Sequence, residues 1–273
     1  MELKVTRYAV EESIATLTLD RPHRLNAWTG RMHTEYRWLL EQAEHDPSVR
    51  VVVVTGAGKG FCAGADTKAL EGHVERGGYD PGTPSDLARP GFGVRAEFDA
   101  DFAFQFGLTK PIIAAVNGPA AGVGLVLACF ADLRFAVRGA KCTTAHGRLN
   151  LPAEYGLSWL LPRLVGLTAA NDLLLSSRVF LTDEGMQLGL WNGLFEPEEL
   201  MPRTYAYARE LVRTVAPGSL AATKRQIYTD LHRDAASSVR EANELLERMM
   251  KEPDYREAVA AFTEKRSPRW RSE

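Results

Sequence analysis

The sequence predicts an α/β protein that ends in a helical region. Two segments share the order of a buried strand, a Gly-rich turn and a helix: VRVVVVTGAGKGFCAGADTKAL and PIIAAVNGPAAGVGLVLACF. Continuous apolar strands that alternate with helices are typical of parallel sheets covered by helices. From about Glu198 the chain shows amphipathic helical segments and no strand pattern. We therefore expect a core over residues 1–197 and a C-terminal helical region over residues 198–273.

The first elements are predicted to be a β-hairpin and a helix. Two β-branched stretches, LKVTRYAV and IATLTLD, flank a turn at residues 11–13, and Arg21-Pro22 ends the second stretch. Thr29 is a suitable N-cap for a helix whose apolar side chains recur at helical spacing. Asp46-Pro47 closes that helix, and one of its faces must pack on the sheet.

The middle of the chain combines a loop with further strands and helices. Residues 72–93 hold six glycines and three prolines, a composition that predicts a mobile surface loop, either a lid or a partly disordered flap. A helix is expected from about Arg95 to Leu108, before the strand PIIAAVNG. Later helical segments are expected near residues 157–161, 168–176 and 183–188, and in the tail near residues 202–215, 219–231, 237–250 and 254–265.

Composition argues against several classes of function. The chain has 273 residues with 33 Lys and Arg against 35 Asp and Glu, and this net charge of −2 does not favour sequence-independent binding of nucleic acid. Cys62, Cys129 and Cys142 form no CxxC pair and the histidines no HxxxH or HExxH pair, so we expect neither disulfides nor a metal. No stretch reaches the roughly 20 apolar residues of a membrane span, and we expect a cytoplasmic protein.

The glycine run TGAGKG does not match a nucleotide-binding loop. A GxGxxG pattern that begins at Gly56 meets Phe61 where its last glycine should stand, and no GK[ST] follows. The chain also has no GxSxG turn, which would carry the nucleophile of an α/β-type serine hydrolase. The glycines therefore need another interpretation.

The two Gly-rich turns suggest a site made of backbone. A turn that leads into a helix leaves N–H groups without partners, so two such turns brought together can donate to one oxygen atom. The candidate donors are the N–H groups of Ala65 and Val123, which would form an oxyanion hole. The alternative interpretation is that the glycines only allow strands and helices to pack closely.

Several ordered motifs point to a known family. They are LDRPHRLNAW, VVVVTGAGKGFCAGADTKAL, TKPIIAAVNGPAAGVGLVLACFADLRFAV, EYGLSWLLPRLVG and LTDEGMQLGL, with FTEKRSPRW near the C-terminus. Through these motifs the chain resembles the crotonase family, the enoyl-CoA hydratase/isomerase superfamily, over roughly residues 10–195. The resemblance implies a spiral of ββα units with a C-terminal helical trimerisation region. It also implies coenzyme A thioester substrates, no permanently bound cofactor, and a homotrimer or hexamer.

The resemblance also assigns binding residues. It places the hole donors at Ala65 and at Val123, where the family usually has glycine, with Gly124 as the alternative second donor. Lys265 is a candidate contact to the CoA phosphate of a neighbouring subunit, and a solvated helix-end charge is its alternative role. Asp66 fits a cap of the following helix better than a reacting group. The CoA-binding residues that the resemblance implies are Arg24, Leu25, Ala63, Ala65, Asp66, Thr67 and Lys68.

The candidate catalytic groups differ from those that the resemblance implies for hydratases. Hydratases hold a water between two glutamates, and these places carry Val126 and His146 here. Glu154 instead matches the place where enoyl-CoA and dienoyl-CoA isomerases carry a catalytic Glu or Asp. Capping of the next helix is the alternative role of Glu154, and His146 is either an inert loop residue, a substrate contact or a second acid/base. Apolar neighbours should raise the pKa of Glu154, namely Leu151, Leu157, Trp159 and Leu160.

Three functions are consistent with this pattern. The first is an enoyl-CoA isomerase in which Glu154 moves a proton between two carbons while the hole holds the dienolate. The second is an enoyl-CoA hydratase of fatty acid degradation that uses Glu154 with His146 or an ordered water. The third is an acyl-CoA binding protein with little catalysis, because both hydratase glutamates are replaced.

Overall fold

A six-stranded sheet forms the centre of the protein. The structure is a computed structural model, and it describes residues 1–76 and 94–271. The first two strands pair antiparallel and every later pair is parallel. A second sheet joins β5 (Ala120–Ala121), β7 (Lys141–Thr143) and β8 (Phe180–Leu181). The α/β class and the N-terminal hairpin are thus confirmed. The larger sheet has the order β1 (Thr6–Glu11), β2 (Ile14–Leu19), β3 (Val51–Gly56), β4 (Ile112–Val116), β6 (Leu133–Val137) and β9 (Gly193–Phe195).

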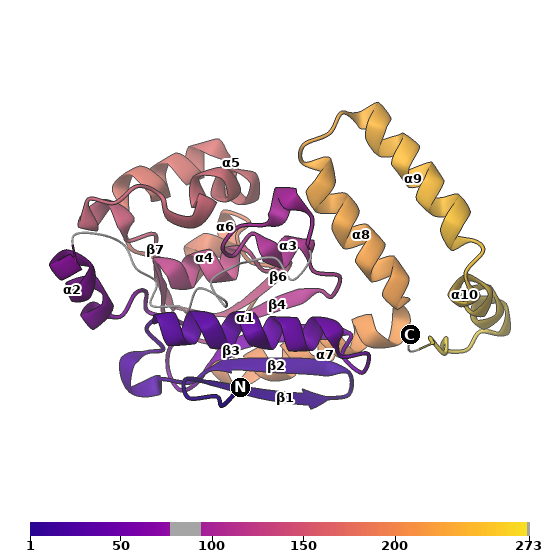
Figure 1. The fold of residues 1–273 in the computed structure, drawn as a ribbon, viewed down its shortest axis with the longest axis horizontal. Coiled ribbons are helices and arrows are strands. Elements are labelled where there is room, and N and C mark those ends of the chain that lie inside the picture. Colours follow the sequence, from indigo (N-terminus) through magenta and orange to yellow (C-terminus); the bar gives the residue numbers. More distant parts are fainter. Residues whose placement is uncertain (77–93, 272–273) are drawn as a thin grey trace.

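Helices cover both faces of this sheet (Figure 1). One face packs against α1 (Gly30–His45) and α4 (Val123–Cys129), and the other packs against α7 (Pro197–Thr214). In β3, Val52 and Val54 join the first core and Val51 and Val53 the second. Because both faces are buried, this strand is a continuous apolar run rather than an alternating one.

The helix α1 begins and ends as the sequence predicts. The Thr29 side chain accepts a hydrogen bond from the Met32 N–H at 3.2 Å, which satisfies one of the free donors of the first turn. Asp46 follows the last helical residue in an extended conformation. The helix is held to the N-terminus by Glu35, whose buried carboxylate accepts the N–H groups of Lys4 and Val5.

The prediction of one helix from Arg95 to Leu108 is wrong. The segment forms a 3-10 turn, η2 (Ala96–Phe98), and a short helix, α3 (Phe104–Gly107). Phe102 lies between them with a positive φ of 59°, which no right-handed helix accommodates. Its ring is 1% exposed and packs on other aromatic rings. Burial of this ring therefore overrides the helical pattern of the segment.

The remaining core elements follow the predicted order. The first Gly-rich turn leads into α2 (Thr67–Arg76), so residues 72–76 of the expected lid are helical, and residues 77–93 lie outside the described residues. The segments expected near 157–161 and 168–176 belong to one stretch, α5 (Leu157–Ser176), which Gly166 interrupts with φ 78° and ψ 159°. Three short turns and a helix complete the core: η1 (Pro22–Arg24), η3 (His146–Leu149), η4 (Glu154–Gly156) and α6 (Thr182–Gln187).

The C-terminal helices reach away from the sheet (Figure 1). Beyond α7 these are α8 (Pro217–Asp230), α9 (Ala235–Met249) and α10 (Pro253–Glu264), which confirm the predicted helical tail. The second half of α8 is anchored to the core, because Lys224 Nζ lies 2.8 Å from the Asp132 carboxylate and Tyr228 donates to the same carboxylate at 2.8 Å. The Tyr228 ring also stacks on Phe106, with ring centroids 3.8 Å apart.

Candidate functional site

The two Gly-rich turns meet in space. Cys62 and Ala120 form an isolated parallel bridge, in which the Ala121 N–H donates to the Cys62 carbonyl at 3.0 Å and the Cys62 N–H to Pro119 at 3.1 Å. A Cβ atom on Gly124 would lie 2.1 Å from the Cys62 carbonyl oxygen, so only glycine fits there. Glycine is therefore required for close packing, as the alternative interpretation proposed, and this packing brings both turns to one place.

The candidate hole donors have no backbone partners within the described residues. Trp28 pairs with the segment around Ala65. The Trp28 N–H donates to the Gly64 carbonyl at 2.7 Å, and the Trp28 carbonyl accepts from the Asp66 N–H at 2.9 Å, so the Ala65 N–H takes no part in the pairing. Val123 is the first residue of α4, where an N–H has no partner inside the helix. Both N–H groups are thus available to a ligand oxygen.

Asp66 secures the first turn rather than offering a reactive group. Its carboxylate accepts from Arg21 Nη2 at 2.8 Å and from the Lys68 N–H at 3.0 Å, so it caps the start of α2. Burial alone would raise its pKa, but these hydrogen bonds and the positive charge of Arg21 lower the pKa below its ordinary value. Arg21 also donates to the Ala27 carbonyl at 2.5 Å. The arginine therefore ties the Ala65 segment to the preceding loop.

Glu154 begins the turn η4, which packs against α4. The carboxyl is half-buried, and burial raises its pKa while the nearby His146 lowers it to a smaller extent. Within the described residues, no side chain caps the first turn of α5, so the structure does not support a capping role for Glu154. The next residue, Tyr155, has a positive φ of 51° and packs its ring on Phe102 at a centroid distance of 5.0 Å.

His146 begins the turn η3 and is 7% exposed. Its neighbour Ala145 has a φ of 61°, a conformation that non-glycine residues seldom adopt. The loop lies beside the second Gly-rich turn, because the Gly122 N–H donates to Thr143 at 3.0 Å. The structure therefore brings His146 close to both Glu154 and the start of α4.

The predicted CoA-binding residues form one group with a single exception. Arg24 and Leu25 lie beside the first turn, because the Leu25 carbonyl accepts from the Ala63 N–H at 3.0 Å. The exposed members of the group are Arg24, Leu25, Ala65, Thr67 and Lys68. Lys265 is the C-cap of α10, and α10 and α2 lie at opposite ends of the molecule (Figure 1). Lys265 is thus not brought to the site of its own chain.

A cluster of aromatic rings around the site was missed by the sequence reasoning. Phe102 packs on Trp28 at 5.6 Å, on His33 at 5.9 Å and on Tyr155 at 5.0 Å between ring centroids. Trp28 pairs with Ala65, and Tyr155 follows Glu154, so the cluster links the first hole donor to the candidate base. Its members come from separate segments, and no spacing in the sequence indicates that they meet.

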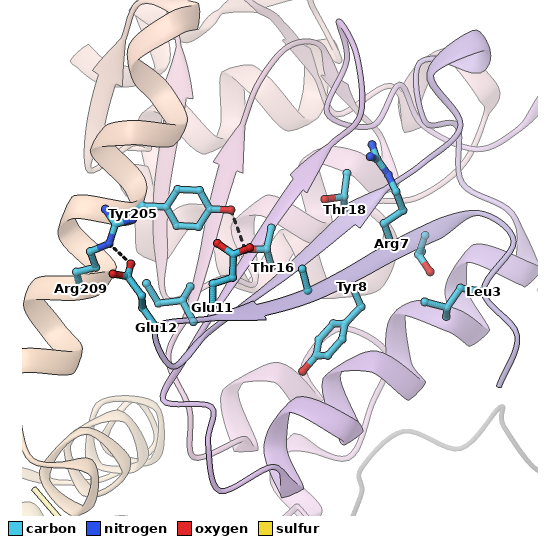
Figure 2. A pocket seen from close by; sticks show the side chains of 12 residues that line it. Leu3, Arg7, Tyr8, Glu11, Glu12, Thr16, Thr18, Tyr205 and Arg209 are labelled. Atoms are coloured by element: carbon cyan, nitrogen blue, oxygen red, sulfur yellow. Dashed lines mark hydrogen bonds and ion pairs between the residues drawn. The ribbon is translucent and has the colours of Figure 1, made fainter.

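A surface hollow of about 610 Å³ lies elsewhere, on the outer face of the hairpin β1–β2 beside α7 (Figure 2). Thr16 Oγ1 and the Tyr205 hydroxyl are 2.8 Å apart there, and Arg209 pairs with Glu12. Among the residues that the structure describes, the lining of this hollow includes no predicted site residue. The hollow is therefore separate from the candidate site.

Residues 1–76 and 94–271 contain no group of three or more His, Cys, Asp or Glu side chains placed to hold a metal ion. No helix in the same ranges is both long and apolar enough to cross a membrane.

The chain is similar to known proteins over nearly its whole length. A family model described as enoyl-CoA hydratase/isomerase matches residues 9–273. A protein named probable enoyl-CoA hydratase from Mycobacterium tuberculosis is 37% identical over 265 residues, covering 93% of this chain and 88% of that protein. The 1,2-epoxyphenylacetyl-CoA isomerase of Escherichia coli is 34% identical over 264 residues, or 96% of each chain. A probable enoyl-CoA hydratase/isomerase from Mycobacterium abscessus has a crystal structure with a TM-score of 0.86 and 28% identity, covering 98% of this chain and 99% of that one.

Proposed function

Because the chain belongs to the enoyl-CoA hydratase/isomerase family, we propose that it shifts a double bond in an enoyl-CoA thioester with Glu154 as the single base. The observation that carries this proposal is the half-buried Glu154 carboxyl with its raised pKa, in a turn that packs against α4. A base works best when its pKa lies near the working pH, and burial moves Glu154 in that direction.

The reaction needs one base and one oxyanion site. Glu154 removes a proton from carbon 2 of a 3-enoyl-CoA, and the electron pair moves onto the thioester oxygen as a dienolate. The N–H groups of Ala65 and Val123 donate to that oxygen, which stabilises the charge that develops there. Glu154 then returns the proton to carbon 4, which leaves the double bond between carbons 2 and 3. The carboxylate is regenerated at the end.

Hydration of a 2-enoyl-CoA is the second candidate. His146 favours it, because this buried imidazole stands where the resemblance implies a second hydratase glutamate. Several similar proteins are also named enoyl-CoA hydratases. Val126 argues against hydration, because it stands where the resemblance implies the first hydratase glutamate. This side chain is 1% exposed and has no polar atom that could bind a water.

We further propose how coenzyme A and neighbouring subunits bind. The CoA moiety would lie along Arg24, Leu25 and the segment from Ala63 to Lys68, and Lys265 would reach the CoA phosphate of a neighbouring subunit in a trimer or hexamer. Residues 198–273 would serve this assembly, and residues 1–197 would carry the chemistry. Large apolar side chains exposed on the C-terminal helices support an assembly: Ile227, Val239, Leu246, Val259 and Phe262.

The test compares wild type with Glu154→Gln on matched 3-enoyl-CoA and 2-enoyl-CoA thioesters in D₂O, with products followed by mass. We expect wild type to shift the double bond and Glu154→Gln to lose about 10²–10⁴-fold in rate, as removal of a general base typically does. Glu198→Gln, an exposed position on α7, is the matched control and should keep full activity. A loss below about tenfold in Glu154→Gln would remove the residue from this role.

A further inference from the structure

The His146 ring carries a buried polar atom that the protein does not satisfy. Its Nδ1 is inaccessible to solvent and has no hydrogen-bond partner within the described residues. Buried polar groups are nearly always paired, because an unpaired one loses its hydration without compensation. His146 is 7% exposed and, among the residues with such an atom, belongs to the predicted site, so a ligand oxygen is a candidate for the missing partner.

The loop that carries His146 is fixed by an internal hydrogen-bond network. Ser177 Oγ accepts from the Gly147 N–H at 3.0 Å and lies 3.1 Å from Thr144 Oγ1. Thr143 Oγ1 accepts from the Ala145 N–H at 3.1 Å, which holds that residue at its positive φ. Strained backbone persists only where its surroundings enforce it, and such residues cluster at functional sites. The backbone on both sides of His146 is therefore held in place, so the unpaired nitrogen does not result from a loosely held loop.

The loop that carries His146 lies beside the start of α4. A Cβ on Gly122, the residue before Val123, would stand 3.9 Å from the Ala145 Cβ, so the loop touches the start of α4. His146 is also close enough to Glu154 to lower the pKa of that carboxyl, against the larger effect of burial. A ligand held by the hole and the base therefore passes close to the imidazole.

We propose that His146 Nδ1 hydrogen-bonds an oxygen atom on the acyl group of the substrate, beyond the thioester carbonyl. This inference rests on the proposed function and names its substrate class, which is acyl-CoA thioesters that carry a hydroxyl, keto or epoxide oxygen. His146 is then a specificity-determining residue. A straight hydrocarbon chain leaves Nδ1 unpaired, and a chain with an oxygen at the right carbon satisfies it.

A bound water is the other source of such an oxygen, and the neighbouring side chains favour the substrate. A stable buried water makes about three hydrogen bonds. Val126, which stands where the resemblance implies the first hydratase glutamate, is apolar and buried and provides none of them. A substrate oxygen is held by covalent bonds to a chain that is already positioned, and it needs only the one hydrogen bond from His146.

The experiment measures kcat/KM for three six-carbon 3-enoyl-CoA thioesters, one unsubstituted and two with a hydroxyl on carbon 5 or carbon 6. We expect wild type to prefer one hydroxylated substrate by about 10- to 100-fold, because a buried polar group is then paired instead of orphaned. His146→Asn should retain most of this preference, because its amide places a polar atom near the position of Nδ1. His146→Gln extends its amide toward the position of Nε2, and His146→Leu has no polar atom, so both should lose the preference. Equal preference in all four proteins would overturn the inference.

Binding and product analysis keep this result separate from the proposed function. The Glu154→Gln variant should bind the same thioesters without turnover, so their dissociation constants can be measured in it. These constants should show the same preference for one hydroxylated thioester, and the preference should disappear when His146→Leu is added. Glu154-dependent isomerisation with no hydroxyl preference would refute the inference and leave the proposed function intact. No isomerisation of any thioester by wild type would refute the proposed function. A gain of one water on 2-enoyl-CoA that His146→Leu abolishes would show that Nδ1 binds water and would also overturn the inference. Circular dichroism of each variant confirms that it is folded.

Discussion

Substitution of Gly124 by alanine tests whether the contact between the two turns builds the oxyanion hole. The new Cβ would lie 2.1 Å from the Cys62 carbonyl oxygen and 2.8 Å from the Cys62 Cβ. Ordinary contacts between such atoms are about 3.5 Å, so the turns must separate by roughly 1 Å. The displaced segment carries Ala65, and the helix that moves against it begins at Val123.

We expect Gly124→Ala to lower both stability and turnover. Overpacking of this kind costs about 1–3 kcal/mol, which corresponds to a fall in Tm of about 2–12 °C for a chain of this size. A misplacement of about 1 Å in a catalytic constellation costs about 10²-fold in rate. The assay is the isomerisation rate at saturating 3-enoyl-CoA, together with thermal unfolding.

Gly185→Ala is the matched control for this experiment. Its Cβ would lie 2.4 Å from Trp191 Nε1, so it also creates a close contact, but in α6 and with neighbours that belong to neither turn. This variant should lose stability and keep its kcat. The reasoning is refuted if Gly124→Ala keeps wild-type kcat, or if Gly185→Ala loses kcat to the same degree.

Four further predictions concern Glu154, Arg21 and Phe102. Because burial raises the pKa of Glu154, the activity should fall on the acid side at a pH above the ordinary glutamate value, as a pH–rate profile would show. The folded protein also holds the Glu154 proton more tightly than the unfolded chain, so the free energy of unfolding decreases as the pH rises through the raised pKa. Glu154→Gln removes the buried charge and should therefore raise the Tm at neutral pH. Arg21→Leu should lower the free energy of unfolding by about 1–3 kcal/mol and reduce kcat, because Asp66 loses its charged partner. An unchanged denaturation midpoint and an unchanged kcat would contradict this role of Arg21. Phe102→Ala should lower the free energy of unfolding in urea by about 3–5 kcal/mol, and it should slow turnover because the turn that carries Tyr155 is loosened. A loss below about 1 kcal/mol would argue that the aromatic cluster does not support this turn.

Local patterns were sufficient to predict most of the elements. The apolar run VVVV identifies β3 because that strand is buried on both faces, and Thr29 identifies the start of α1 because its side chain caps the first turn. Both features depend on residues close together in the sequence. The same is true of the tail, whose prolines at 217 and 253 stand at the starts of α8 and α10.

Features that depend on distant contacts were not predictable in this way. The helix expected across Phe102 fails because the ring is buried against Trp28 and Tyr155, which belong to other segments. The support of Asp66 by Arg21 and the unpaired Nδ1 of His146 depend likewise on side chains that meet only in the folded chain. The resemblance assigned places to Ala65, Val123, His146 and Glu154, and the structure adds their surroundings.

The anchoring of α8 also limits how far the chain can be shortened. Asp132 follows the second Gly-rich segment, and its carboxylate is neutralised by Lys224 and bonded by Tyr228, both from the C-terminal helices. A truncated enzyme that ends before α8 would leave this carboxylate without its counterion and would uncover the ring of Phe106. A truncation at residue 197 would also remove α7, which covers one face of the sheet. The helices from residue 197 onward therefore complete the core of the preceding residues, and a fragment without them would expose apolar surface of that core.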